Sequence, residues 1–251
     1  MSLINPPSIA PEGVTHRTFF SKLIDSEIGY NIYLPPCYET GDERYPVTYH
    51  LHGYTGNESS DIWVMNDICK ANKSIMVFAN GTPDNGYING KLPMDSIITT
   101  ELVPFIDAHY GTIATREART VTGFSMGGAG AFYYAVKYPE LFGSVVAYAG
   151  TYHHFYHKGS RTVGIAKEEI AAVYESMIDE KRYLEEGNIL NLVYVNADKL
   201  RGKSKIALHV GTEDVLFCDN EIMHMFLDRI DIPHTYKTFD GVEHQLDKIL
   251  R

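Results

Sequence analysis

Apolar and polar residues alternate in several short segments near the start of the chain, and this alternation predicts strands. Val14–Phe20 and Ile28–Leu34 are joined by a short polar turn, so we predict an antiparallel pair. Tyr45–His52 and Ser74–Phe78 are rich in β-branched and aromatic residues and are predicted as the next two strands.

Farther along, apolar runs with helical spacing alternate with short, fully apolar runs. The helical spacing predicts helices over Asp61–Ala71, Asp95–His109, Met126–Lys137 and Leu216–Ile230. The short runs predict strands over Arg119–Gly123, Ser144–Ala149, Ile206–Val210 and Thr235–Phe239. Strands that alternate with helices of this length favour a mostly parallel central sheet flanked by helices, which is an α/β fold.

Residues 151–205 interrupt the alternation, because a single helix would suffice between the strands on either side. The segment is polar, begins with the aromatic and histidine run Tyr152–His157, and is helical in pattern around Ala166–Ile178. We predict one domain over residues 1–251, with residues 151–205 as a cap-like insertion over the carboxyl end of the sheet. Open α/β sheets place their ligand sites at that end.

The composition indicates a globular protein that avoids anionic partners. Of its 251 residues, 44% are hydrophobic, and 32 acidic against 22 basic residues give a formal net charge of −10. Such a charge repels phosphate backbones and anionic lipids, so neither nucleic acid nor a membrane is expected as a partner. No apolar run approaches the roughly 18 residues of a membrane span.

Three cysteines are too few for a disulfide framework, and their spacing fits no zinc motif. The chain begins Met-Ser-Leu-Ile-Asn-Pro-Pro, which lacks the basic and apolar regions of a secretory signal. Both a secreted protein whose signal peptide has been removed and a cytoplasmic protein fit this start. The compartment and the oligomeric state are left open.

The segment Gly123-Phe124-Ser125-Met126-Gly127 carries the strongest chemical signal. It fits the Gly-x-Ser-x-Gly nucleophile elbow of α/β-hydrolases, and it stands between a predicted strand and a predicted helix, as that turn requires. The turn exposes the hydroxyl of Ser125 and places the amide of Met126 at a helix N-terminus. There the amide can stabilise a developing oxyanion.

A serine hydroxyl needs a base, and the base needs a carboxylate that orients it. In this architecture the order along the chain is Ser, Asp, His. Asp214 follows the apolar run Ile206–Val210 and is the predicted acid. Glu213 is adjacent but would point differently, whereas Asp219 and Asp198 would need another topology.

His244 is the predicted base, because it follows the last predicted strand at the same sheet edge as Asp214. His234 begins that strand and His224 lies mid-helix, so neither fits the role. The loop containing Gly53 and Tyr54 follows the third strand, and the amide of Tyr54 is the predicted second oxyanion donor. His52, which precedes this loop, is interpreted as bracing it.

Histidines and aromatic residues also gather at the start of the insertion. His153, His154 and His157 lack a carboxylate or cysteine partner at ligand spacing, so no metal and no cofactor is expected. We interpret Tyr152, His153 and Phe155 instead as a wall of the substrate cleft, because their rings can stack on a phenol or a sugar.

The chain resembles the esterase D-like α/β-hydrolases, which include the feruloyl and acetylxylan esterases of carbohydrate esterase family 1, S-formylglutathione hydrolases and mycolyltransferases. The matching stretches extend over most of the chain: Leu51–Gly56 with Trp63, Glu101–Asp107, Gly123–Gly128, Tyr138–Phe142 and Gly211–Phe217. The resemblance implies a triad of Ser125, Asp214 and His244, with backbone oxyanion donors at Tyr54 and Met126.

The resemblance also implies a substrate class, with Trp63 among the substrate-binding residues. The favoured substrates are feruloyl or acetyl esters of plant cell-wall polysaccharides, as small molecules or linked to the polysaccharide. A cytosolic esterase or thioesterase for small acyl groups and an inactive glycan-binding member are the alternatives. Gln245 and Leu246 follow His244, where such esterases often have a tryptophan, and the oxyanion loop lacks the cysteine expected of a formylglutathione hydrolase.

Overall fold

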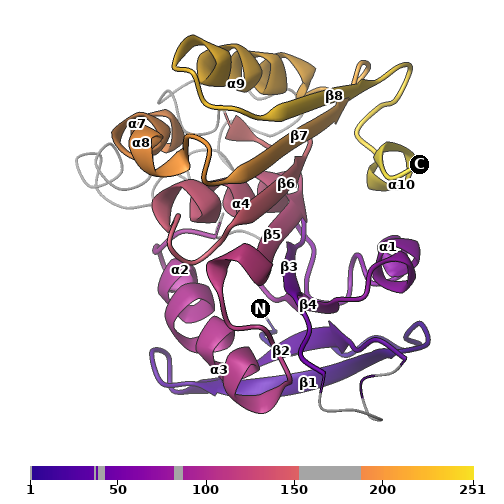
Figure 1. Ribbon diagram of the computed structural model, residues 1–251. Coiled ribbons are helices and arrows are strands. Elements are labelled where there is room, and N and C mark those ends of the chain that lie inside the picture. The colour runs from indigo at the N-terminus through magenta and orange to yellow at the C-terminus, as the bar shows by residue number, and fades with distance from the viewer. Residues whose placement is uncertain (1, 37, 39–42, 82–86, 153–187) are drawn as a thin grey trace.

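The computed structural model describes residues 2–36, 38, 43–81, 87–152 and 188–251. Within these residues, eight strands form one sheet in the order β1-β2-β4-β3-β5-β6-β7-β8 (Figure 1). The strands are β1 (Val14–Ser21), β2 (Ser26–Tyr33), β3 (Val47–Leu51), β4 (Ile75–Ala79), β5 (Arg119–Phe124), β6 (Ser144–Tyr148), β7 (Lys205–Gly211) and β8 (Thr235–Phe239).

The sheet changes from antiparallel to parallel pairing at β4. Strand β2 pairs antiparallel with β1 and with β4, whereas every pair from β4–β3 through to β7–β8 is parallel. The predicted mostly parallel sheet with an antiparallel opening pair is therefore confirmed. Parallel pairing brings the carboxyl ends of β3, β5, β7 and β8 to one edge, and the loops that follow them carry the predicted chemistry.

Helices cover both faces of the sheet (Figure 1). One face carries α2 to α4, α7 and α9, and the other carries α1 and α10. Their bounds are α1 (Asn66–Ala71), α2 (Met94–Ser96), a π-helix η2 (Ile97–Leu102), α3 (Val103–His109), a 3₁₀ turn η3 (Arg116–Ala118), α4 (Met126–Lys137), α7 (Ile189–Val195), α8 (Ala197–Leu200), α9 (Phe217–Arg229) and α10 (Leu246–Ile249).

The two faces bury separate cores. The larger core includes Tyr49, Phe132 and Tyr134, which are fully buried against the face that carries α4. The smaller core includes Ile62 before α1 and Leu246 in α10. Strands β3 and β4 are buried along most or all of their length, as expected for a sheet covered on both faces.

Two predicted helices differ from those observed. The segment Asp61–Ala71 is helical only from Asn66, because the residues before it form a loop in which Asp61 binds His50. The segment Asp95–His109 contains the π-helix η2 instead of a uniform α-helix. Pro104 has no amide hydrogen to donate to Thr100, so this helix cannot keep α-helical bonding throughout.

The predicted insertion at 151–205 lies largely outside the described residues, since 153–187 are not described. Its described end contains α7, which packs against α4, and α8. A covering role for this segment therefore stays a prediction.

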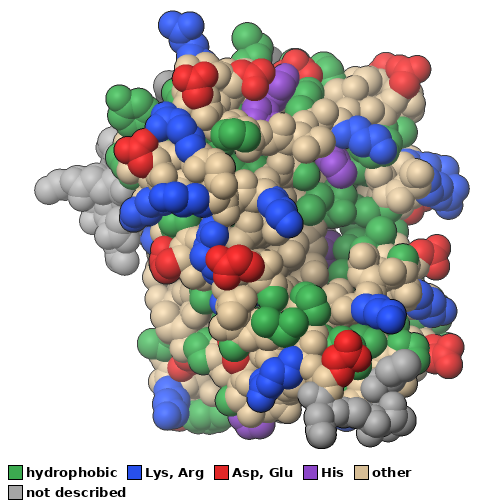
Figure 2. All heavy atoms as spheres, in the orientation of Figure 1, with side chains coloured by type: hydrophobic (Ala, Val, Ile, Leu, Met, Phe, Trp, Pro, Cys, Tyr) green, Lys and Arg blue, Asp and Glu red, His purple; other side chains and the backbone are tan. Residues whose placement is uncertain are grey.

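The surface mixes charges of both signs. Figure 2 shows lysine and arginine side chains interspersed with aspartate and glutamate over the face in view, so the acidic excess is not gathered there. None of the helices in the described part of the chain is long and apolar enough to cross a membrane. Cys69 and Cys218, the two cysteines that the structure describes, are both free thiols.

Candidate active site

Ser125 stands on a sharp turn between β5 and α4. Its backbone has φ 58° and ψ −117°, a conformation that residues with a side chain rarely adopt. The turn is held from both sides, because the Ser125 amide donates to the Tyr148 carbonyl at 2.9 Å and the Ser125 carbonyl accepts from Ala129 at 3.0 Å. This strained geometry is that of the predicted nucleophile elbow.

The two glycines of the motif allow the backbones around Ser125 to meet. A Cβ at Gly127 would lie 1.9 Å from the carbonyl oxygen of Leu51 in β3, and one at Gly123 would lie 2.3 Å from the carbonyl oxygen of Gly127. Neither contact is possible between real atoms, so any side chain at either position would force α4 away from the sheet.

His244 lies on the loop after β8 and faces the serine. Its Nε2 is 2.9 Å from Oγ of Ser125, and 31% of the side chain is exposed. The imidazole ring stacks on Phe124, with 4.5 Å between centroids and 28° between planes. The Phe124 ring therefore fixes the plane in which His244 can accept the serine proton.

Asp214 lies on the loop after β7, and its carboxylate is fully buried. Oδ2 is 2.8 Å and Oδ1 is 3.0 Å from Nδ1 of His244, and Oδ1 also accepts from the amide of Leu216 at 2.8 Å. Because a carboxylate can only accept, Nδ1 carries the hydrogen and Nε2 keeps a lone pair toward Ser125. The structure thus brings together the three residues of the predicted triad.

The alternatives weighed for the acid and the base lie elsewhere. Glu213 is exposed, Asp219 lies in the first turn of α9, and Asp198 lies in α8. His224 and His234 lie together at the other end of α9, where they contact each other and not Ser125.

The predicted oxyanion loop lies against the elbow. A Cβ at Gly53 would be 3.5 Å from Cβ of Ser125 and 3.5 Å from the carbonyl oxygen of Phe124. Tyr54 is the next residue along the chain and therefore lies beside the nucleophile. Within the described residues, no acceptor pairs with the amide of Tyr54. Met126 is the first residue of α4, where amides have no partner one turn earlier in the helix.

His52 braces this loop, as interpreted from the sequence. Its Nδ1 donates to the carbonyl of Gly53 at 2.9 Å, and its Nε2 accepts from the amide of Gly81 at 3.0 Å. The His52 carbonyl accepts from the hydroxyl of Tyr87 at 2.9 Å. Burial lowers the pKa of His52, so the ring stays neutral, which is the form that can make both bonds.

The predicted substrate-binding residues differ in their exposure to solvent. Trp63 is exposed, and its indole N–H donates to the carbonyl of Ile9 at 3.3 Å. Tyr152 is 1% exposed and packs edge-on against Phe132, so its ring belongs to the core and not to an open cleft wall. The prediction for Tyr152 is corrected accordingly. His153 and Phe155 lie outside the described residues.

The structure adds supporting residues that the sequence did not single out. Phe124 stacks on His244, and the amide of Leu216 holds the Asp214 carboxylate. Asn220 is fully buried in α9, and its side-chain amide donates to the carbonyls of Gly150 and Leu216. Phe124 occupies the variable position that precedes Ser125 in the Gly-x-Ser-x-Gly motif. This position was the one signal in the sequence that could have pointed to its contact with the catalytic residues.

The N-terminal segment, residues 3–9, crosses the loop that follows the oxyanion segment. Asn5 donates through its side chain to the buried Glu58 at 2.9 Å, and the hydroxyl of Ser59 donates to the Asn5 carbonyl at 2.6 Å. The Leu3 carbonyl accepts from Gly29 in β2. This segment therefore fastens the loop to the antiparallel end of the sheet.

Comparison with known proteins assigns the family. The model of the "Putative esterase" family matches residues 21–230. The chain belongs to this esterase family. An esterase of Mycobacterium tuberculosis is 33% identical over 147 residues, which is 53% of this chain and 32% of that protein. An endo-1,4-beta-xylanase/feruloyl esterase of Xylanibacter ruminicola is 32% identical over 147 residues, 50% of this chain and 20% of that protein. The chain thus spans a third or less of the length of these relatives.

Solved structures of similar fold include a ferulic acid esterase and an S-formylglutathione hydrolase. A ferulic acid esterase has a TM-score of 0.76 at 22% identity, with 94% of this chain and 92% of that chain covered. An S-formylglutathione hydrolase from Agrobacterium tumefaciens has a TM-score of 0.73 at 19% identity, with 99% and 94% covered. These matches confirm the predicted α/β-hydrolase fold for this member of the esterase family.

Proposed function

We propose that this member of the esterase family is a serine carboxylesterase that cleaves acyl esters by two-step acyl transfer. The observation that carries the proposal is the line of hydrogen bonds from Asp214 through His244 to Ser125, made by three loops at one sheet edge. The chemistry requires this convergence, since a serine hydroxyl reacts only when a neighbouring base takes its proton.

In the first step Nε2 of His244 takes the proton of Ser125 as Oγ forms a bond to the ester carbonyl carbon. Asp214 stabilises the imidazolium and keeps the ring in its orientation. The tetrahedral intermediate then collapses, and the proton on Nε2 goes to the departing alcohol. In the second step His244 activates a water molecule, which releases the acid and restores Ser125.

The amides of Tyr54 and Met126 are the proposed donors to the oxyanion. One comes from the loop that lies against the elbow and the other from the first residue of α4. A donor of this kind is typically worth about 3 kcal/mol in the transition state. Neither contribution can be removed by side-chain substitution, because both donors are backbone groups.

For the substrate we favour feruloyl or acetyl esters of plant cell-wall polysaccharides. The support is the relative from Xylanibacter ruminicola, whose name includes feruloyl esterase and whose match covers 50% of this chain. The exposed ring of Trp63 offers a surface on which a phenol or a sugar could stack.

The first experiment tests the chemistry. Hydrolysis of p-nitrophenyl acetate is measured for the wild-type protein and for Ser125→Ala, with melting temperatures to show that both are folded. Turnover should be abolished in the variant. Equal activity of the two proteins would rule out the triad mechanism, and a folded wild-type protein without turnover would point to an inactive glycan-binding member.

The second experiment tests the substrate by comparing kcat/KM for methyl ferulate, acetylated xylan and S-formylglutathione. A preference for either of the first two supports the cell-wall assignment. A preference for S-formylglutathione, with negligible rates on the others, would replace it with a small-acyl thioesterase and leave the triad mechanism intact.

A further inference from the structure

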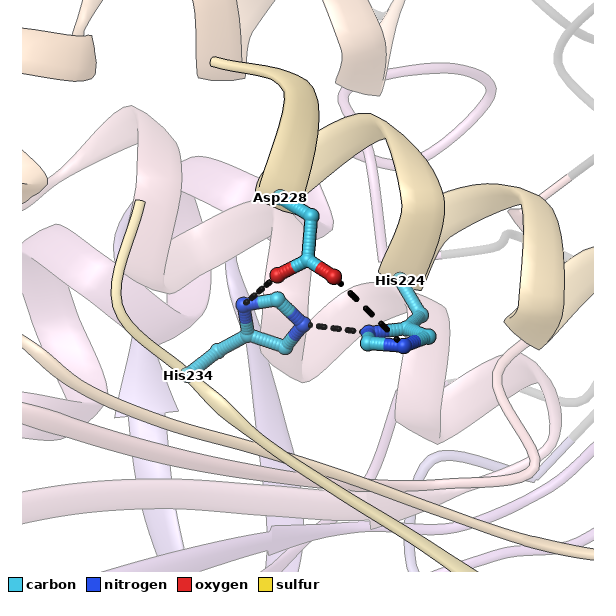
Figure 3. Close-up of side chains that lie close together, drawn as sticks. All are labelled: His224, Asp228 and His234. Carbon is cyan, nitrogen blue, oxygen red and sulfur yellow. Dashed lines mark hydrogen bonds and ion pairs between the residues drawn. The ribbon is translucent and has the colours of Figure 1, made fainter. Parts of the chain in front are cut away.

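Two histidines and an aspartate gather beside the C-terminal half of α9 (Figure 3). His224 and Asp228 are four residues apart on α9 and therefore share one face of the helix. The chain then reverses through Asp231, whose φ is 54°, and the amide of Ile232 donates to the carbonyl of Leu227 at 3.0 Å. This turn brings His234 back against the same helix face, immediately before β8.

His234 is already set in the form that binds metals. Its side chain is 2% exposed, and its Nδ1 lies 2.8 Å from the carbonyl oxygen of Ile232. A carbonyl can only accept, so Nδ1 carries the hydrogen and Nε2 of the neutral ring has a lone pair, which accepts from His224 in the metal-free protein. Metal-binding histidines commonly have this arrangement, in which the second ring nitrogen donates to a backbone carbonyl.

The carboxylate of Asp228 lies beside both rings, with Oδ1 3.9 Å from Nδ1 of His234, and the two rings face each other through their other nitrogens. Nδ1 of His224 lies 2.7 Å from Nε2 of His234, and Nε2 of His224 lies 3.6 Å from Oδ2 of Asp228. The His224 ring is held by stacking on Tyr236, with 4.4 Å between centroids. One donor atom from each of the three residues lies within 4.8 Å of the other two.

We propose that His224, Asp228 and His234 bind one zinc ion. Two imidazole nitrogens and a carboxylate oxygen form a set that suits zinc, and the exposure of Asp228 leaves a fourth position open to water. Two nitrogens on one zinc ion, each about 2.0–2.1 Å from it, lie roughly 3.3 Å apart. The rings need to separate by about 0.6 Å, and the exposed Asp228 side chain can rotate to complete the set.

Proton balance is simple. In the metal-free protein the hydrogen on Nδ1 of His224 lies between the two rings and is donated to Nε2 of His234. Zinc takes the place of that hydrogen, which in a neutral His224 moves to Nε2 on the side of Asp228, so that Nδ1 binds through its lone pair and no proton is released. The net charge of −10 favours the cation.

The site has a structural role and no place in the acyl transfer. The site lies just before the first residue of β8, whereas His244 lies after the last residue of that strand. The five residues of β8 separate the two positions, and five extended residues span roughly 17 Å. Zinc would join the end of α9 to the start of β8. These two elements connect the loop of Asp214 to the loop of His244, so the ion would stabilise the segment that holds acid and base at a fixed separation.

The test uses untagged protein dialysed against EDTA and titrated with zinc chloride in a calorimeter. One zinc ion per chain should bind, and zinc at about 100-fold above its Kd should raise Tm by roughly 5 °C. His224→Gln and Asp228→Asn should each raise the Kd about tenfold or more. His109→Gln removes an exposed histidine on another helix and should keep the wild-type Kd.

Two results would overturn the proposal. One is a wild-type protein that takes up no zinc, with a Tm indifferent to zinc and EDTA, which would leave the cluster as a hydrogen-bonded clasp. The other is zinc binding that both variants retain with the wild-type Kd, which would place the ion at another site. Because both readouts concern binding and stability, neither depends on the proposed esterase activity.

Discussion

Nδ1 of His244 lies 2.8 Å from Oδ2 of Asp214, and this pair joins a fully buried carboxylate to an imidazole that is one-third exposed. The carboxylate receives a second bond from the amide of Leu216, which fixes its position. The arrangement leaves the ring open to solvent and to the Ser125 hydroxyl on one side while its orientation is set from inside the protein.

The first prediction concerns Asp214→Asn. The side-chain amide introduced by this substitution would donate to Nδ1 of His244, so the hydrogen would move to Nε2 and the lone pair facing Ser125 would be lost. We expect kcat on p-nitrophenyl acetate to fall roughly 10⁴-fold, with little change in KM. The control is Glu213→Gln at the exposed neighbouring position. A loss below about tenfold in Asp214→Asn would contradict the role of Asp214.

The second prediction concerns Gly127→Ala. The new methyl group would lie 1.9 Å from the carbonyl oxygen of Leu51, so α4 must shift away from β3 and carry the elbow with it. We expect a loss of about 1–3 kcal/mol in the free energy of unfolding, measured by urea denaturation, together with a large fall in kcat. Gly53→Ala is the comparison for stability, because its Cβ would meet nothing closer than 3.5 Å. Equal unfolding free energies for the two variants would contradict the prediction.

The third prediction concerns the buried carboxylate of Asp95, which accepts from Lys137 at 2.6 Å, Tyr138 at 3.0 Å and Tyr133 at 3.1 Å. Asp95→Ala leaves a partly buried ammonium group without its counter-ion, so we expect a loss of about 3–5 kcal/mol in the free energy of unfolding. Glu117→Gln breaks an exposed ion pair with Arg116 and should cost less than about 1 kcal/mol. Similar losses in the two variants would show that the Asp95 cluster contributes no more than a surface pair.

The fourth prediction concerns pH and His52. Burial lowers the pKa of His52 in the folded protein below the usual value of 6.5, which the residue keeps in the unfolded chain. As the pH falls below 6.5, the unfolded chain therefore binds a proton at His52 before the folded protein does. Stability is therefore full above about pH 6.5 and falls as the pH decreases. His52→Gln removes this contribution, so its unfolding free energy should vary less between about pH 7.5 and pH 5 than that of the wild type. An unchanged pH dependence in the variant would contradict this assignment.

The sequence predicted those features that depend on local pattern. The strands around Val14–Phe20 and Thr235–Phe239 have the alternation or β-branched content of strands, and both are observed close to the predicted bounds. The elbow at Ser125 is a motif whose strand, turn and helix are contiguous in the chain. The positions of Asp214 and His244 followed from the rule that parallel strands share one carboxyl edge.

Other features depend on contacts that the pattern does not encode. The strand order β2-β4-β3 is set by pairing between distant segments, such as Tyr30 with Ala79. Tyr152 was predicted to face a substrate because it opens an aromatic run, but its ring fits against Phe132 in the core. His224 and His234 were considered only as possible bases. The four-residue spacing of His224 and Asp228 was the available signal for a separate cluster.

Residues 3–9 limit how this protein can be engineered. Because the Leu3 carbonyl binds Gly29 and Asn5 binds Glu58, fusion partners or surface anchors joined upstream need a spacer that leaves this segment free to lie in place. Arg251 is exposed beyond α10, and its one ion pair within the described residues is with Asp247 at 4.0 Å. An attachment made at Arg251 would therefore disturb fewer of the described contacts than one made at residues 3–9 when the protein is immobilised on a support.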